Sequence, residues 1–172
     1  MAIEFYSTKD DYGAFSNFSA HGFNLDGRWW PTSEHYFQAQ KFVGTSDGYV
    51  EEIRQAKSPM IAARLGRSRK VKLRRDWESA KDAVMRRAVL KKFETHADIR
   101  ALLLSTGDEK LVEKTTDDHY WGVGTNGTGK NRLGQILMEV RQILRERAPD
   151  DSAPPASGAG RNAPQRHRAT EK

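Results

Sequence analysis

The segment 30–42 constrains the fold more than any other part of the chain, because it predicts where a strand ends and how the next helix is placed. Pro31 should stop the preceding strand, and the hydroxyl groups of Thr32 and Ser33 are suited to cap the N-terminus of a helix. We expect this helix to continue to about Val43. The directions of the side chains that follow are then set by helical geometry.

Three polar side chains of this helix fall on one face. At roughly 100° per residue, Glu34, Gln38 and Lys41 lie at about 0°, 40° and −20° around the helix axis. Phe37 at about −60° and Phe42 at about 80° flank the stripe, which is unusual for a face that points to solvent. We therefore expect the helix to form one wall of a pocket, where aromatic rings exclude water and the polar groups converge on a ligand.

A purely structural interpretation of the stripe fits helix geometry equally well. Glu34 and Gln38 are four residues apart, so they can hydrogen bond to each other within a buried helix. Glu34 also lies near the helix start, where a carboxylate interacts favourably with the helix dipole whatever its other role. Helix geometry leaves both interpretations open.

Hydrophobic periodicity and turn residues divide the chain into several helices and few strands. An Asp-Gly pair between two apolar runs predicts a β-hairpin over residues 23–30, and Ser58 followed by Pro59 predicts a helix N-terminus. Strands are expected at residues 3–6 and 110–116, and further helices at residues 47–56, 58–65, 76–95, 97–106 and 131–147. The sequence thus predicts a single, mostly helical α+β domain with a small β-sheet or hairpin.

The composition changes after Ala148. Four of the six prolines lie in residues 149–172, among Gly, Ala and Ser, and large apolar residues are scarce there. Such a segment cannot bury enough surface to offset its conformational entropy, so we expect a folded domain at residues 1–148 and a disordered tail at 149–172. The absence of an apolar N-terminal run and of a membrane-length segment predicts a soluble, cytoplasmic protein with no membrane partner.

The composition also excludes several kinds of chemistry. The chain has no cysteine, which rules out disulfides, thiolate nucleophiles and cysteine-ligated metals. The five histidines form no i,i+4 pair, and only His119, beside Asp117 and Asp118, is a weak candidate for a metal ligand. The chain also lacks the G-x-S-x-G motif of serine hydrolases. We expect neither an obligatory metal nor a cofactor.

Basic residues are concentrated in one part of the chain. Between Arg54 and Lys92 there are fourteen Lys or Arg residues and only three acidic ones, whereas the whole chain has a net charge of +6. The run 64–75, which includes Arg74, is suited to attract the phosphate groups of a nucleotide or a nucleic acid. The alternative is a solvated helix face with a basic bias.

A glycine-rich stretch precedes the last predicted helix. Gly122, Gly124 and Gly127 match the spacing G-x-G-x-x-G, and a Walker-type loop that begins at Gly124 fails at Asn131, where Ser or Thr is required. No buried strand precedes these glycines and only one helix follows, so neither nucleotide-binding fold is expected. The glycines would still allow backbone N–H groups to approach an anion at the start of that helix.

Five ordered motifs carry a resemblance to a known family. They are Phe15-Ser16-Asn17-Phe18, the segment 33–41, Arg74-Arg75-Asp76-Trp77, Asp118-His119-Tyr120-Trp121-Gly122 and the segment 129–134. Together they resemble the NADAR domain, the YbiA-like N-glycosidase family, and the similarity covers about residues 3–147. The resemblance implies cleavage of N-glycosidic bonds in ribosylated compounds: phosphoribosylamino-pyrimidine intermediates of riboflavin synthesis, or ADP-ribose attached to guanine bases.

The resemblance also implies which residues form the site. It assigns catalytic roles to Glu34, Lys41 and Asp118. Substrate binding is expected of Asn17, Gln38, Arg74, Trp77, Trp121, Gly129 and Asn131. Such a site would take a small phosphoribosyl or ADP-ribosyl substrate, and ADP-ribosylated DNA or RNA is a further candidate partner.

The expected residues suit the chemistry of this bond. Cleavage of a ribose C1′–N bond builds positive charge on the sugar, so a carboxylate near C1′ and a proton donor to the departing nitrogen both lower the barrier. Glu34 and Asp118 can divide these two tasks. Lys41, if desolvated by Phe37 and Phe42, would have a lowered pKa and could form a Schiff base with ring-opened ribose. The carboxylate and lysine mechanisms both stay open.

Two other functions are compatible with the same residues. One is a non-catalytic module that senses ADP-ribose or NAD, which would bind its ligand without turnover. The other is a basic nucleic-acid-binding module, whose affinity for any DNA would fall steeply with salt concentration.

Overall fold

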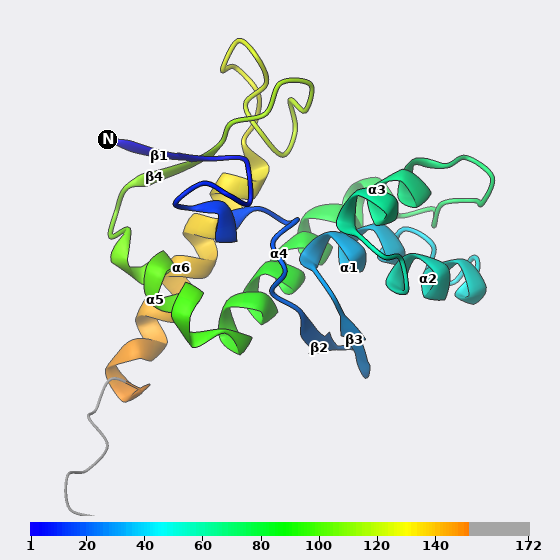
Figure 1. Cartoon of the computed structure of the whole chain (residues 1–172), viewed down its shortest axis with the longest axis horizontal. Helices are drawn as coiled ribbons and strands as arrows, with labels where there is room; N and C mark the ends of the chain where they lie inside the picture. Colours follow the sequence, from blue (N-terminus) through cyan, green and yellow to red (C-terminus); the bar gives the residue numbers. More distant parts are fainter. Residues whose placement is uncertain (152–172) are drawn as a thin grey trace, which may run out of the picture.

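One long helix, α4, lies at the centre of the molecule. The computed structural model describes residues 1–151 of the 172. Helices α5 and α6 pack against one side of α4, and α1 packs against the other (Figure 1). Helices α2 and α3 in turn pack against α1. The helices are α1 (Ser33–Gln40), α2 (Asp47–Arg54), α3 (Pro59–Arg67), α4 (Trp77–Thr95), α5 (Ala97–Ser105) and α6 (Arg132–Asp151), with a 3-10 turn, η1, at Gly13–Phe15.

The strands form two separate two-stranded sheets. Strand β1, Ala2–Phe5, pairs in parallel with β4, Lys110–Glu113, and brings the chain start beside the segment that follows α5. Strands β2, Phe23–Leu25, and β3, Arg28–Trp30, form an antiparallel hairpin. Its two turn residues have positive φ angles of 54° and 78°, as a type I′ turn requires. The expected α+β domain, mostly helical with a small sheet and a hairpin, is confirmed.

The expected helix starts are also confirmed by their caps. The Thr32 hydroxyl accepts a hydrogen bond from the His35 N–H at 3.2 Å, and the Ser58 hydroxyl accepts one from the Ile61 N–H at 3.1 Å. Each cap satisfies one of the backbone donors that have no partner inside the first turn. Local sequence therefore fixes where α1 and α3 begin.

Two element ends differ from the sequence prediction. Helix α1 stops at Gln40 instead of continuing to Val43, because the next N–H groups bond back to the third preceding carbonyl and tighten the turn. Strand β4 ends at Glu113 instead of Thr116. The Glu113 carbonyl accepts the N–H groups of both Thr115 and Val123, so the chain turns there. Lys41, directly after α1, and Glu113, at the end of β4, line the same cavity.

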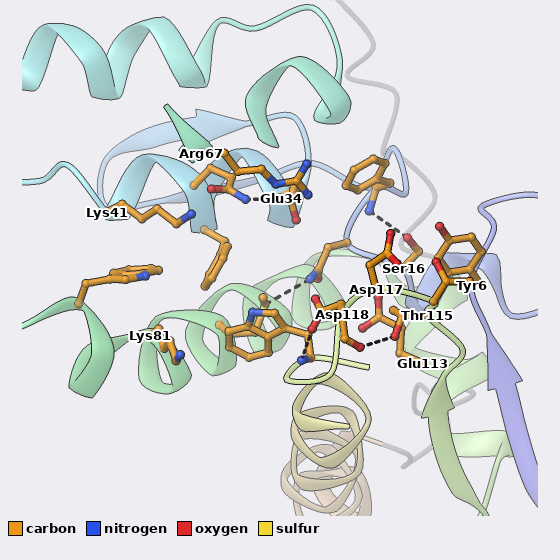
Figure 2. A pocket seen from close by; sticks show the side chains of 18 residues that line it. Tyr6, Ser16, Glu34, Lys41, Arg67, Lys81, Glu113, Thr115, Asp117 and Asp118 are labelled. Carbon is orange, nitrogen blue, oxygen red and sulfur yellow. Dashed lines mark hydrogen bonds between the residues drawn. The ribbon is translucent and has the colours of Figure 1, made fainter. Parts of the chain in front are cut away.

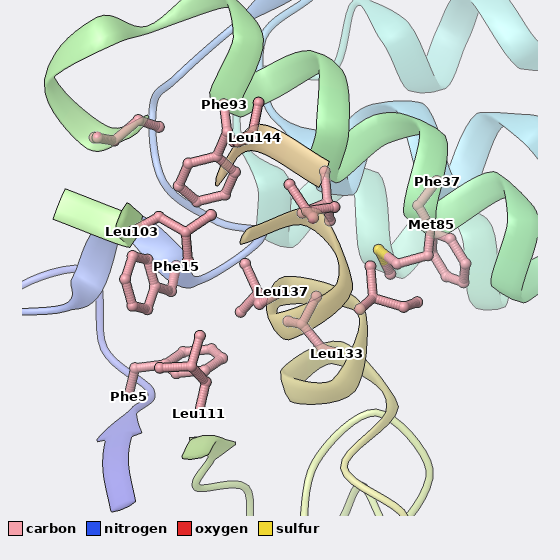
Figure 3. Close-up of a cluster of buried hydrophobic side chains, with 14 of the residues drawn as sticks. Phe5, Phe15, Phe37, Met85, Phe93, Leu103, Leu111, Leu133, Leu137 and Leu144 are labelled. Carbon is pink, nitrogen blue, oxygen red and sulfur yellow. The ribbon is translucent and has the colours of Figure 1, made fainter. Parts of the chain in front are cut away.

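Two hydrophobic clusters meet at α1. The first lies between α4, α5, α6, β1 and β4 and includes Phe5, Phe15 and Leu137 (Figure 3). The second lies under α2, α3 and the hairpin and includes Trp30 and Phe42. Neighbouring residues of α1 enter different clusters, because its apolar side chains point in more than one direction around the axis. The polar stripe of α1 lies between them.

The C-terminal helix extends beyond the expected domain boundary. Helix α6 reaches Asp151, so the first three residues of the expected tail are helical in backbone. Residues 152–172 of that tail lie outside the described part of the chain. Within residues 1–151, no helix is both long enough and apolar enough to cross a bilayer.

Candidate active site

A cavity of about 440 Å³ opens where α1 faces the segment after β4. Its walls come from α1, the last turn of α3, the first half of α4, the loop at residues 16–18 and the segment 113–121 (Figure 2). These pieces are distant in sequence and are brought together by the packing of α1 and α6 on α4. The volume is within the range typical of small-molecule sites.

The polar stripe predicted on α1 lines this cavity. Glu34, Gln38 and Lys41 all contribute to its wall. Gln38 Nε2 donates a 2.7 Å hydrogen bond to Glu34 Oε1, so the i,i+4 pair of the structural interpretation is present as well. The Glu34 side chain is buried, and burial is the main cause that raises the pKa of its carboxyl group. The stripe therefore forms a pocket wall and also contains the buried hydrogen bond between Glu34 and Gln38.

Lys41 lies in an aromatic and largely dry environment. Its Nζ is 5.7 Å from the ring centre of Phe37 and 5.9 Å from that of Trp77, and it donates a 3.4 Å hydrogen bond to the Gly66 carbonyl. Burial lowers the pKa of Lys41 to about 8, although Glu34 opposes the change. About half of the Lys41 side chains are therefore free amines near pH 8, and a smaller fraction at neutral pH.

The expectation that Phe42 forms the second aromatic flank of Lys41 is wrong. Phe42 is fully buried in the second cluster and packs edge-to-face on Tyr49, with ring centres 4.7 Å apart. The tight turn after Gln40 rotates Phe42 away from the cavity, and Trp77 takes the expected place.

Asp118 reaches the cavity from the opposite wall. Its Oδ1 accepts hydrogen bonds from the backbone N–H groups of Tyr120 at 2.9 Å and Trp121 at 2.8 Å. These two bonds fix the carboxylate in the turn, while the side chain still lines the cavity (Figure 2). Glu34, Lys41 and Asp118, which are far apart in the sequence, therefore share one site.

Both expected tryptophans line the cavity and pack on the same ring. The centres of the Trp77 and Trp121 rings lie 5.1 Å and 5.2 Å from that of Phe37. Trp77 is only 6% exposed, so its main contacts are with the core. The three rings form one apolar surface of the cavity against which a flat base can stack.

Asn17 lines the cavity from the N-terminal loop. Its Oδ1 accepts a 2.9 Å hydrogen bond from the Ser33 hydroxyl, and its backbone carbonyl accepts one from the Glu34 N–H at 3.2 Å. Asn17 therefore connects this loop to the first turn of α1, through the Ser33 side chain and the Glu34 backbone.

Three residues expected to bind substrate are not among the residues that line the cavity. Arg74 forms a salt bridge with Asp76, with Nε 2.6 Å from Oδ1. Gly129 is packed so tightly that a Cβ there would lie 2.5 Å from the Gly122 carbonyl oxygen. Asn131 is buried and bonds to the backbone of β4. Of the three, Asn131 contacts a residue of the cavity, because its Oδ1 accepts the N–H group of Glu113.

The glycine-rich stretch does not present its backbone to the cavity. The N–H groups of Gly124, Gly127 and Gly129 bond to Thr115 Oγ1, the Gly124 carbonyl and the Val123 carbonyl. Because these donors already have partners inside the loop region, they are not free to hold an anion. The glycines instead allow the chain to fold back on itself, and Gly124 and Gly127 have φ angles of +69° and +75°.

Several cavity residues were not singled out by the sequence. Arg67 was covered only as part of the basic run, and Lys81 only as part of the periodic pattern of α4. Glu113 was included in a predicted strand without a role of its own. The signal that could have identified Glu113 is a carboxylate at the end of a short apolar strand, four and five residues before two aspartates.

Most of the charged side chains of the cavity are separated by sign. Lys41, Arg67 and Lys81 lie toward one end, and Asp117 and Glu113 lie toward the other (Figure 2). A ligand with an anionic group at one end and a developing positive charge at the other matches this arrangement. Among residues 1–151, no group of three or more His, Asp or Glu side chains is placed to hold a metal ion.

Comparison with known proteins gives the same family throughout. The NADAR domain model matches residues 4–145. The chain is 61% identical to the N-glycosidase YbiA of Shigella boydii over 142 residues, which are 83% of this chain and 88% of that one. It is also 46% identical to the chloroplastic riboflavin biosynthesis protein PYRR of Zea mays over 155 residues, 83% of this chain but 25% of that longer protein.

A solved structure agrees with these relatives. The NMR structure of YbiA from Escherichia coli matches with a TM-score of 0.80 and 58% identity, and the match covers 87% of this chain and 88% of that one. The relatives carry the names expected from the five motifs, so the resemblance and the class of N-glycosyl hydrolases that it implies are confirmed. The chain therefore belongs to the NADAR domain family.

Proposed function

We propose that this protein hydrolyses the ribose C1′–N bond of a phosphorylated ribosyl-nitrogen compound. The observation that carries the proposal is the meeting of Glu34 and Lys41, on one helix face, with Asp118 from the opposite wall of one cavity. The name of the maize relative favours a phosphoribosylamino-pyrimidine intermediate of riboflavin synthesis as substrate. ADP-ribose on a guanine base, free or in DNA or RNA, is the second candidate.

Carboxyl groups provide most of the chemistry in this proposal. As the C1′–N bond breaks, positive charge develops on the ribose ring and is stabilised by a carboxylate nearby. Glu34 and Asp118 approach the cavity from opposite walls, so both can flank the ring. Burial raises the pKa of Glu34, but its ionised form interacts strongly with such a charge, because little water screens it.

The cationic end of the cavity is the proposed phosphate site. Arg67 presents a planar guanidinium group suited to bind phosphate oxygens, and Lys81 adds a second positive charge. Trp77 and Trp121 provide the apolar surface for the base. This assignment replaces Arg74 and the glycine loop as the expected phosphate ligands.

Lys41 offers a second route through the same site. A primary amine that is partly unprotonated can attack C1′ of the ring-opened sugar. The bond from C1′ to the base then breaks, and the base nitrogen leaves with the electron pair and a proton from the attacking amine. Water hydrolyses the resulting Schiff base and frees the sugar and the lysine amine. The aromatic surroundings of Lys41 and its lowered pKa of about 8 support this role. The carboxylate route and the amine route require the same cavity.

The proposed function is tested by measuring release of free base. Wild-type protein is incubated with a phosphoribosylamino-pyrimidine and, separately, with ADP-ribosylated guanosine, and the product is separated by chromatography. We expect release from at least one substrate and a loss of about 10²-fold or more in the Glu34→Gln variant. The matched control is Glu52→Gln, at an exposed position of α2, which should keep full activity.

Two outcomes would contradict the proposal. Binding of ADP-ribose or NAD without release of any base would identify a sensor module instead of an enzyme. Retention of full activity by Glu34→Gln would show that the chemistry lies elsewhere.

A further inference from the structure

Glu113 is held in a fixed position at the edge of the cavity. It is the last residue of β4 and pairs with Phe5 of β1. Its N–H donates to Asn131 Oδ1 at 3.0 Å, and its carbonyl accepts from the N–H groups of Thr115 and Val123. The backbone is thus bonded on both sides, and the side chain lines the cavity (Figure 2).

The carboxyl group of Glu113 has an unusual environment. Its Oε2 is shielded from solvent and has no hydrogen-bond partner within residues 1–151. An ionised oxygen in such a place is costly, whereas a neutral carboxylic acid is tolerated. Burial raises the pKa of Glu113 to about 8, with smaller contributions from Asp118 and Glu34. Glu113 therefore carries a proton at neutral pH.

The other two carboxyl groups of the site have partners that favour negative charge. Glu34 accepts a hydrogen bond from Gln38 and interacts with the positive charges of Lys41 and Arg67. Asp118 accepts two backbone N–H groups. Burial raises the pKa of Glu34 as well, but Glu34 and Asp118 each accept hydrogen bonds at the carboxyl group, whereas Oε2 of Glu113 accepts none within residues 1–151.

We propose that Glu113 is the acid that protonates the departing nitrogen, a role that rests on the proposed N-glycosidase function. The C1′–N bond breaks, its electron pair stays on nitrogen, and nitrogen takes the proton of Glu113. Water then adds to C1′ and returns one proton to the Glu113 carboxylate. Glu34 and Asp118 remain available to stabilise the positive charge on ribose, so the two tasks fall to different residues.

This assignment has a defined pH dependence. The ionisable groups that face Glu113 are Glu34 from α1 and Asp118 from the loop after β4, and Asp117 and Tyr6 also line the cavity. All of these are acidic groups, and none neutralises a negative charge on Glu113. Because the protonated form is the active one, kcat/KM should fall as pH rises through about 8.

The experiment compares wild type and Glu113→Gln in base release between pH 5.5 and 10. Glutamine keeps the shape of the side chain but cannot give up a proton. We expect kcat to fall by about 10²-fold or more with little change in KM, and the decline of kcat/KM at alkaline pH to disappear. Glu4→Gln, at an exposed position of the same sheet, is the control and should behave as wild type.

Each outcome decides one part of the question. If wild type turns over and Glu113→Gln has the same kcat or the same alkaline decline, the role of Glu113 is overturned. The proposed function is left intact by that result. Absence of turnover in wild type would overturn the proposed function itself. If Glu113→Gln does not fold, as judged by its thermal unfolding, Glu113→Asp replaces it. A reduced kcat of Glu113→Asp with the alkaline decline retained supports the proposal. Full activity of Glu113→Asp without the decline overturns it.

Discussion

Gln38 is fixed between Glu34 and Gly66. Its Nε2 lies 2.7 Å from Glu34 Oε1, and a Cβ built at Gly66 would lie 1.9 Å from Gln38 Oε1. Helix α3 thus packs against the amide that holds the carboxyl group of α1. The orientation of Glu34 in the cavity depends on the absence of a side chain at residue 66.

Substitution Gly66→Ala should reduce activity without preventing folding. The added methyl group displaces the Gln38 amide and with it the hydrogen bond to Glu34, and small misplacements of reacting groups cost about 10- to 100-fold in rate. The measurement is kcat/KM for base release. Gly48→Ala in α2 is the control, because a Cβ there meets no atom within 4 Å. Equal activity of the two variants would show that the Gln38 contact is not needed.

Borohydride trapping should reveal whether Lys41 forms an adduct with the sugar. Because burial lowers the pKa of Lys41 to about 8, the free amine becomes dominant above this pH. We expect the yield of trapped adduct, measured by mass spectrometry, to rise between pH 6 and 9 and to vanish in Lys41→Met. Lys57→Met, at an exposed position, should trap as wild type does. Base release without any trapped adduct would favour the carboxylate route alone.

The sequence predicts those features that depend on neighbouring residues. Thr32 and Ser58 identify helix starts because a cap acts within one turn, and Glu34, Gln38 and Lys41 share a face because helical periodicity is local. The motifs also identify Asp118, although only the fold explains why it meets α1 across the cavity.

Features that depend on tertiary packing escaped prediction. Phe42 turns away because the helix ends early, and Arg74 is engaged by Asp76. Glu113 enters the cavity only because β4 pairs with β1 and the following loop folds back onto its backbone. Its raised pKa comes from burial among residues distant in sequence, which no local pattern encodes.

Asn131→Gly should weaken both stability and activity. The Asn131 side chain accepts the Glu113 N–H and donates to the Leu111 carbonyl, and its φ angle of 54° is one that glycine also adopts. The substitution therefore removes two buried hydrogen bonds without strain, at a cost of about 1–3 kcal/mol. Urea denaturation measures this loss, and kcat should fall because Glu113 is less firmly held. Asn126→Gly, in the exposed loop, should change stability by less than about 0.5 kcal/mol.

Lys92 should make stability increase with pH above neutrality. Its Nζ is fully buried and donates to the carbonyls of Ala14 and Ser16, next to the cavity loop. Burial lowers the pKa of Lys92 to about 7, whereas an unfolded lysine titrates near about 10.4. Between these values the unfolded chain binds more protons, so the free energy of unfolding rises with pH, by up to about 1.4 kcal/mol per pH unit from this group.

Replacement of Lys92 by Met should remove this contribution. Urea denaturation of wild type and Lys92→Met at several pH values between 7.5 and 9.5 measures the two slopes, and their difference isolates Lys92 from other titrating groups. We expect the slope to be smaller in Lys92→Met and unchanged in Lys91→Met, whose side chain is only half-buried. Identical slopes in wild type and Lys92→Met would mean that the buried amine keeps its proton throughout this range, held by the two carbonyls that it contacts.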